Sequence, residues 1–374
     1  MKLKMIFATA YVAMFTLVSC SKNDPVSTKG TEEVQSFFIQ IGKTTQMSRA
    51  EGADMSGQKV EFTDGYLIFA SGDNIGRVIK IVANTPGTDE VTVEKLEQGT
   101  TIEDIPANTK GVYLYGNLGN SISTIGSVAV VDGKLSDVEN LTWVLADIQN
   151  DANDVAKVPV YGKGDVKSGT VYPERLESEF EVKPIGCRLQ IGQISCSDSR
   201  VEELQLAGIF INNFYHSMDA GFALKDNYLV NHGIDITKYS ASGYTNYLNM
   251  KDIITPTDLN DGPATPATPG NSWAYNFMPA PMPHIVLHFA NLKVNGKEPV
   301  TNQYATVAKY STLDENNISS EYTTAERGYV YKLNVDISDY EKQIADLPES
   351  GSTVMGYVDI EIIDWQSKII YPEW

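Results

Sequence analysis

The residue types that most often carry chemistry are sparse in this sequence and poorly grouped. His284 and His288 are four residues apart, a spacing that would bring two imidazoles together on a helix. Pro281, Pro283 and the alternating apolar residues that follow indicate a strand instead. On a strand the two histidines lie about 13 Å apart, at about 3.3 Å per residue, which is too far for one zinc ion. They are therefore predicted to be surface side chains.

Common catalytic motifs are absent from the sequence. It has no G-x-S-x-G turn, no H-E-x-x-H zinc motif and no glycine-rich phosphate loop. Residues 258–262 (DLNDG) have some likeness to a calcium loop but lack the closing glutamate, so a turn is the better interpretation. These observations predict a protein that is not an enzyme and that uses no metal or other cofactor.

The cysteines are too few for a disulfide scaffold, since only positions 20, 187 and 196 carry one. Residues 187–194 have the pattern of one extended strand. Such a strand would hold the Cα atoms of Cys187 and Cys196 up to about 30 Å apart, against a limit of about 7 Å for a bridge. Cys187 alternates with apolar positions and is predicted to be a buried free thiol.

The N-terminal segment has the pattern of a secretion signal. Lysines at positions 2 and 4 precede an apolar run over residues 5–18, too short to span about 30 Å of hydrocarbon with polar flanks. The run ends in LVSC at residues 17–20, which resembles the lipobox of bacterial lipoproteins, where the cysteine becomes the lipidated first residue. We therefore expect a signal peptide over residues 1–19 and lipidation of Cys20. An ordinary cleaved signal is the alternative.

Length and charge narrow the classes of protein further. A chain of 374 residues predicts two or three domains at about 150 residues each. The formal net charge is −19, which repels a phosphate backbone and excludes nucleic acid as a partner. No stretch beyond the signal is long and apolar enough to cross a membrane, so the lipid is the expected anchor.

Alternation of apolar and polar residues dominates the chain and predicts an all-β fold. In residues 34–41, Phe37, Ile39 and Ile41 share one face of a strand. A short helical turn is expected at residues 102–107. Further strands are expected at residues 60–70, 77–82, 91–96, 110–115, 128–131, 141–145, 158–161, 185–191 (half-buried), 204–215, 273–278, 284–289, 329–337 and 354–363.

A new unit is expected to begin near residue 184, so the predicted architecture is two antiparallel β-sandwiches in tandem, residues 50–184 and 185–374. Before the first sandwich, residues 42–57 are rich in Thr, Ser, Ala and Gly and predict an exposed loop of the kind that proteases cut. Arg49 lies in this loop, followed by Ala50. From spacing alone, Arg49 is a solvated linker residue and residues 34–41 are a permanent first strand.

The order of these segments resembles that of the fimbrillin family, the type V pilins of Bacteroidales. The resemblance covers the whole chain. Residues 21–25 are similar to the export tag of Bacteroidales outer-membrane lipoproteins. The fragments that carry the resemblance, besides the lipobox, the first strand and the arginine loop, are Gly208–Tyr215, Trp273–Pro279, Pro283–Leu287, Gly328–Leu333, Asp364–Trp365 and Pro372–Trp374.

The resemblance implies that both sandwiches are transthyretin-like and that the precursor is a lipoprotein of the outer membrane, at the cell surface. It also implies that an Arg-specific protease cuts between Arg49 and Ala50, removing a propeptide of residues 20–49. Subunits then polymerise by strand exchange into an extracellular fimbria that supports adhesion, with copies of the same chain or related subunits as partners. The strand removed in this way contains Val34, Phe37, Ile39 and Ile41.

A vacated groove would accept a strand of another subunit, because it exposes apolar surface and unpaired backbone groups. In the family the C-terminal segment is donated, here residues 354–374. The apolar positions expected to fill the groove are Val358, Ile360, Ile362, Ile370 and Trp374. An ordinary last strand of the second sandwich is the alternative interpretation of this segment.

A second class of function stays open, namely a binding module. A fimbrial tip adhesin or a surface glycan-binding lipoprotein could use exposed tyrosines such as Tyr239, Tyr244 and Tyr247. Ordinary packing of these tyrosines is the more conservative interpretation. Tip subunits of the family lack the donor segment, so residues 354–374 favour a stalk subunit.

Overall fold

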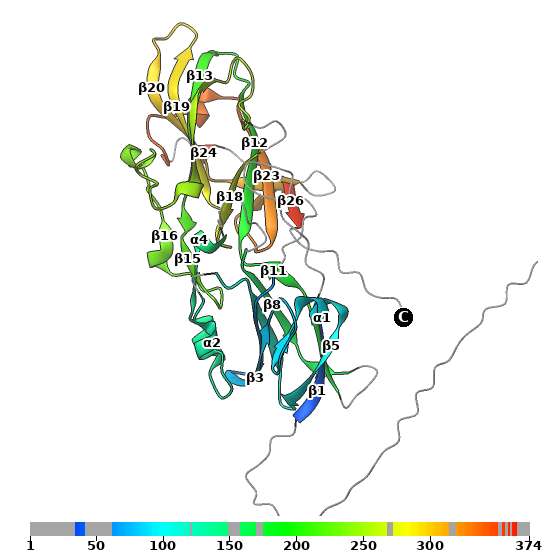
Figure 1. Ribbon diagram of the computed structural model, residues 1–374. Helices are drawn as coiled ribbons and strands as arrows, with labels where there is room; N and C mark the ends of the chain where they lie inside the picture. The colour runs from blue at the N-terminus through cyan, green and yellow to red at the C-terminus, as the bar shows by residue number, and fades with distance from the viewer. Residues whose placement is uncertain are drawn as a thin grey trace, which may run out of the picture. The chain divides into compact units, whose positions relative to one another are not determined.

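The computed structural model describes residues 34–41, 62–119, 122–148, 158–169, 175–267, 272–313, 319–350, 354–355, 358–359 and 361–364, all in one compact unit of residues 34–374. Strands dominate these ranges, as Figure 1 shows, so the all-β prediction is confirmed. Helices are short. None of them, in the part of the chain that is described, has the length and apolarity needed to cross a membrane.

Two sheets form from the first half of the described chain. The four-stranded sheet runs in the order β5 (Thr100–Pro106), β1 (Val34–Ile41), β10 (Leu176–Phe180) and β9 (Lys167–Ser168). The six-stranded sheet runs in the order β11 (Val182–Pro184), β8 (Val160–Asp165), β6 (Gly111–Gly116), β2 (Gly65–Ser71), β3 (Asn74–Ile81) and β4 (Glu90–Val91). Buried apolar side chains of both sheets form a common core, in which Phe37 of β1 meets Phe69 of β2.

The second half builds two further sheets. One has the order β18 (Trp273–Phe277), β12 (Cys187–Cys196), β23 (Tyr329–Ile337) and β26 (Glu361–Asp364). The other has the order β17 (Lys251–Asp258), β13 (Val201–Asn212), β19 (His284–Val294), β20 (Val300–Val307) and β24 (Val354–Met355). The hydroxyl of Tyr275 on β18 donates to Asp252 on β17 at 2.6 Å, which links the end strands of the two sheets.

Smaller elements complete the described ranges. Three small sheets pair β14 (Phe214–Tyr215) with β16 (Leu229–Val230), β15 (Ser217–Asp219) with β7 (Thr142–Val144), and β21 (Tyr310–Leu313) with both β22 (Ser319–Tyr322) and β25 (Val358–Asp359). The helices are α1 (Val93–Gln98), α2 (Ile125–Val128), α3 (Leu135–Glu139), α4 (Leu145–Ile148), α5 (Tyr340–Gln343) and the 3₁₀ turns η2 (Asp226–Tyr228), η3 (Ile236–Lys238) and η4 (Leu248–Met250). The division near residue 184 stays a prediction, and the pairing of β7 with β15 crosses it.

The described sheets are mixed rather than purely antiparallel as expected. Parallel neighbours are β1 with β10, β3 with β4, β12 with β23, β20 with β24 and β21 with β25. Alternation along one strand reports which face is buried but not the direction of its neighbour. Parallel pairing therefore had no signal in the sequence.

Three local predictions are wrong. Residues 91–96 were expected to form a strand, but most of them lie in helix α1. The Thr92 hydroxyl caps the N-terminus of this helix by accepting from the Lys95 amide at 3.3 Å. Residues 102–107 belong mainly to strand β5, since β1 pairs along it. The run at residues 128–131 ends helix α2 instead of forming a strand.

Strand β12 also differs from the half-buried strand that its alternation predicts. Arg188 and Gln190, on the polar face, are only 3% and 1% exposed. Both faces of this strand are therefore covered between residues 187 and 191. The guanidinium of Arg188 donates to the Asn276 side chain at 3.3 Å, and its burial lowers the pKa of Arg188 to about 10.

Candidate functional site

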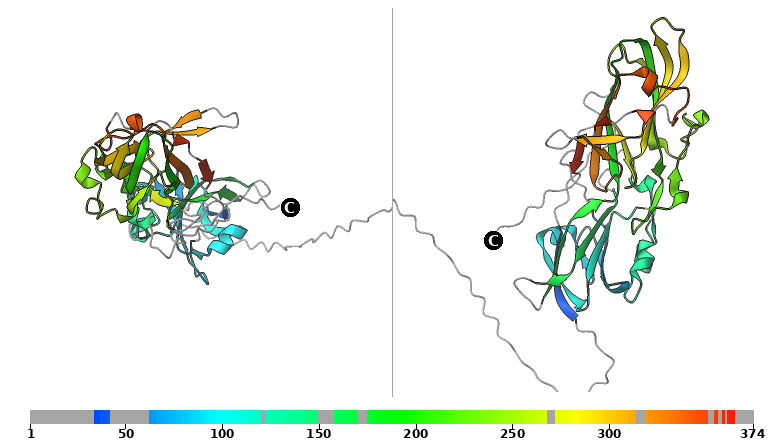
Figure 2. Two further views of the ribbon diagram at one scale, coloured as in Figure 1. Left: turned by 90° about the horizontal axis from the view of Figure 1, so that it is seen from above. Right: turned by 180° about the vertical axis from the view of Figure 1, so that it is seen from behind.

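Strand β1 occupies an interior position in its sheet. On one side it runs antiparallel to β5, from Val34 opposite Pro106 to Ile39 opposite Thr100. On the other side it runs parallel to β10, from Phe37 opposite Leu176 to Ile41 opposite Phe180. Figure 1 shows β1 in blue beside β5, and the same strand is blue in Figure 2. We call the space that β1 fills between β5 and β10 the slot.

The inward face of β1 is part of the core. Phe37, Ile39 and Ile41 are 0%, 0% and 1% exposed. The ring of Phe37 packs edge-to-face on Phe69, with centroids 5.0 Å apart. Val34 is 56% exposed and lies at the start of the strand, outside this contact. The three inward side chains carry the contact between β1 and the core.

The outward face of β1 is fastened more loosely. The Arg175 guanidinium lies over the Phe38 ring, 4.6 Å from its centroid. The Gln40 side chain donates to the Glu97 carbonyl of α1 at 3.2 Å. Gly99, which ends α1 at φ +83°, approaches Phe38 so closely that a Cβ would lie 2.6 Å from the ring. These contacts fix the register of β1 at its C-terminal half.

Removing β1 would change the sheet in a definite way. The backbone groups of β5 and β10 that now pair with β1 would lose their partners along one whole strand length. The core would lose its three inward side chains at the same time. Arg49 and Ala50, where a cut is predicted, lie outside the described residues, as does Cys20.

The predicted donor segment is held differently from β1. Its described pieces are β24, of two residues, β25, of two, and β26, of four. Each lies at the end of its sheet in the order of described strands, and pairs with β20, β21 or β23. Val358 is on β25 and Ile362 on β26, whereas Ile360, Ile370 and Trp374 lie outside the described residues. Short edge pairings of this kind are broken at smaller cost than an interior strand.

Glu349 fastens the chain just before this segment. Its carboxylate accepts from the Asn212 side chain at 2.7 Å and lies 2.7 Å from Nδ1 of His284. Its amide donates to the Thr306 hydroxyl at 3.0 Å. The side chain of Glu349 is 12% exposed, so these bonds are largely shielded from water. They tie residue 349 to β13, β19 and β20. His284 was expected at the surface, and this partly buried role had no signal in its spacing.

Neither a metal centre nor a disulfide forms among the described residues. In these ranges no three His, Cys, Asp or Glu side chains cluster as metal ligands would. Cys187 and Cys196 are both free thiols, and burial raises the pKa of Cys187 well above its usual value. Asp258 accepts from the amides of Leu204 and Asn260 at 3.0 Å each, as in the turn that was predicted there.

The three tyrosines do not form the exposed platform that glycan binding would need. Tyr239 and Tyr244 are 3% and 0% exposed, and their hydroxyls donate to the carbonyls of Gly233 and Ile211 at 2.7 and 2.9 Å. Tyr247 is partly buried and packs edge-to-face on Phe214. Burial raises the pKa of Tyr239 and Tyr244 above the usual value. The conservative interpretation of these side chains is correct.

Comparison with known proteins shows which solved structures share the fold of this chain. No protein-family model matches the chain, and no curated protein matches it significantly. Two candidate cell adhesion proteins from Parabacteroides distasonis align over 89% and 90% of this chain and over 100% and 98% of their own. Their TM-scores are both 0.50, at 10% and 9% sequence identity. This chain has their fold.

A further solved structure, of a fimbrilin from Porphyromonas gingivalis, aligns over 90% of this chain and 99% of its own, with a TM-score of 0.49 and 12% identity. The resemblance to Bacteroidales proteins that the sequence predicted is confirmed for the fold, which this chain shares with the two cell adhesion proteins. Sequence identities this low do not identify functional residues in this chain.

Proposed function

We propose that this chain is a subunit of a surface fimbria, of the fimbrillin family, and that it polymerises by strand exchange. In this scheme Cys20 anchors the precursor in the outer membrane through lipid, and an Arg-specific protease cuts between Arg49 and Ala50. Strand β1 then leaves the slot, and the donor segment of another subunit replaces it. The two halves of the chain would be transthyretin-like sandwiches.

The observation that carries the proposal is the position of β1. It is paired on both sides and buries three apolar side chains, and the covalent chain between it and the next described residue runs through residues 42–61. A cut in that stretch would leave β1 held by noncovalent contacts. Those side chains contribute about 1.5–3 kcal/mol each, or roughly 5–9 together. This is of the same order as the net stability of a domain, about 5–15 kcal/mol. A replacement strand would therefore strongly stabilise a subunit that has lost β1.

Digestion with an Arg-specific protease tests this function. We expect a new N-terminus at Ala50 by sequencing, followed by filaments in electron microscopy. The variant Arg49→Lys keeps the positive charge but removes the cleavage site, so it should stay monomeric under the same treatment. Cutting at Ala50 without any filaments would contradict the proposal and favour a monomeric surface binding protein.

A further inference from the structure

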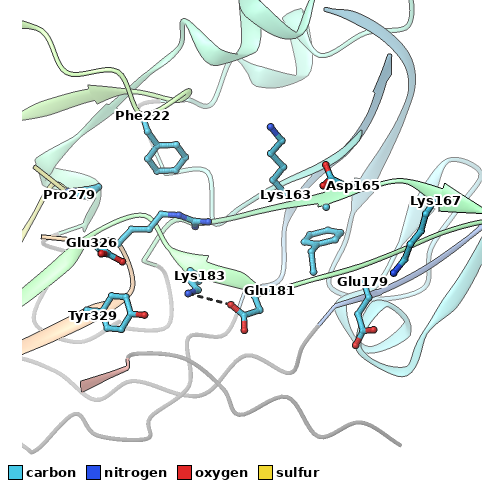
Figure 3. Close-up of a pocket in the computed structure, with 13 residues that line it drawn as sticks. Lys163, Asp165, Lys167, Glu179, Glu181, Lys183, Phe222, Pro279, Glu326 and Tyr329 are labelled. Carbon is cyan, nitrogen blue, oxygen red and sulfur yellow. Dashed lines mark ion pairs between the residues drawn. The ribbon is translucent and has the colours of Figure 1, made fainter. Parts of the chain in front are cut away.

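A groove of about 920 Å³ lies at one end of the slot. Its lining includes Lys163 of β8 and Phe180 of β10, and also Arg327, two residues before β23, and Tyr329, the first residue of β23. Figure 3 shows Lys163, Lys167 and Lys183 among the acidic side chains of this groove. The scheme above does not use this groove.

The groove continues the path of β1. Ile41, the last residue of β1, pairs with Phe180, and the groove is lined by Phe180 and its two chain neighbours. A strand that entered the slot in the direction of β1 would thus deliver its C-terminal end into the groove. The other end of the slot, where Val34 pairs with Pro106, leads away from it.

The groove has fixed groups that suit carboxylates and aromatic rings. The Arg327 guanidinium lies over the rings of Tyr161 and Phe222, 5.0 and 5.3 Å from their centroids, and donates to the Tyr161 carbonyl at 2.8 Å. These contacts fix the positively charged guanidinium of Arg327 at the wall of the groove. Lys183 lies 5.5 Å above the centre of the Tyr329 ring and 3.3 Å from Glu181. A bound carboxylate would find preset cations here, and a bound ring would find aromatic neighbours.

We propose that this groove, which is distinct from the slot, binds the C-terminal end of a second copy's donor segment, residues 371–374 with the α-carboxylate. Trp374 would then lie beyond the slot, not inside it as the sequence predicts. This inference rests on the proposed function. The donor segment is more than twice as long as β1, which has eight residues, so more than half of it must lie outside the slot. Residues 371–374 read Tyr-Pro-Glu-Trp, which offers two rings and two carboxylates. Pro372 cannot donate to a strand ladder, so pairing stops where the groove begins.

The orientation follows from this placement. The donated strand runs parallel to β10, as β1 does, and the terminal carboxylate lies near Arg327. A strand in the opposite direction would bring its end to the Pro106 side of the slot, near the exposed Asn108.

Cysteine cross-linking in filaments tests the inference. The donor end carries Glu373→Cys in a Cys196→Ser background, and Cys187 is kept because it is fully buried. One variant adds Lys163→Cys, at an exposed position in the groove, and a matched variant adds Asn108→Cys at the other end of the slot. After cutting and assembly, a short bismaleimide should give a ladder of linked subunits on a denaturing gel for Lys163→Cys but not for Asn108→Cys.

The outcomes separate the two proposals. A ladder for Asn108→Cys, or intact filaments of the Lys163→Cys variant without a ladder, would overturn the placement of the donor end while leaving strand exchange intact. Failure of the cut wild-type chain to form filaments would overturn the proposed function itself, and the inference would fall with it.

Discussion

Replacing Phe37 with alanine is expected to lower the free energy of unfolding of the uncut chain by about 3–5 kcal/mol, the range typical for truncating a buried phenylalanine. The ring of Phe37 is 0% exposed and packs on Phe69 across the core. Urea unfolding followed by circular dichroism measures the loss. Because Phe37 belongs to a strand that the account treats as removable, this residue sets how firmly the strand is held before cutting.

Phe38 provides the matched control for this substitution. It is the next residue along β1, faces outward and is only partly buried, against Arg175. Phe38→Ala should cost clearly less than Phe37→Ala. After cutting, the weakened strand of Phe37→Ala should also leave on the order of a hundredfold faster or more, since 1.4 kcal/mol corresponds to a factor of ten. Equal losses for the two variants would contradict the account of β1 as a strand held through its inward face.

Deleting residues 351–374 is expected to abolish filament formation while leaving a folded monomer. The deleted stretch contributes only the short edge strands β24, β25 and β26 among the described elements. Glu349 and its bonds to Asn212 and His284 stay in place, so the preceding chain keeps its anchor. Electron microscopy of the cut, truncated chain measures assembly, and circular dichroism checks the fold.

A mixing experiment sharpens the truncation test. The truncated subunit keeps its slot but cannot donate, so small amounts of it added to cut wild-type chain should shorten the filaments. Filaments of normal length and number from the truncated chain alone would show that the C-terminal segment is not the donor.

Part of this fold follows from the sequence because alternation reports burial directly. Residues 34–41 and 329–337 were predicted with the bounds that β1 and β23 have, since their apolar residues alternate without a break. Residues 91–96 were misassigned because a single cap at Thr92 and a glycine at 99 outweigh the β-branched Val91 and Val93. The C-terminal segment read as one strand, but its described part is three short pieces with different neighbours.

The candidate site was visible in the sequence only as separate parts. The face that Phe37, Ile39 and Ile41 share could be seen, but the interior position of β1 depends on β5 and β10, which come about 60 and 135 residues later in the chain. The anchor at Glu349 joins three strands through single side chains, and the groove beside Phe180 is built from segments far apart in sequence. Nothing in local spacing marks such long-range contacts.

The central claim is that a neighbour's strand occupies the place of β1 in the polymer. Hydrogen exchange with mass spectrometry on purified filaments tests it most directly, because it detects both the presence of residues 34–41 and the protection of the strands beside them. If a neighbour's strand replaces β1, the peptide covering residues 34–41 is absent from the filaments, while the amides of β5 and β10 stay as protected as in the uncut monomer. Filaments that retain residues 34–41, or that lack them and leave β5 and β10 unprotected, would contradict it.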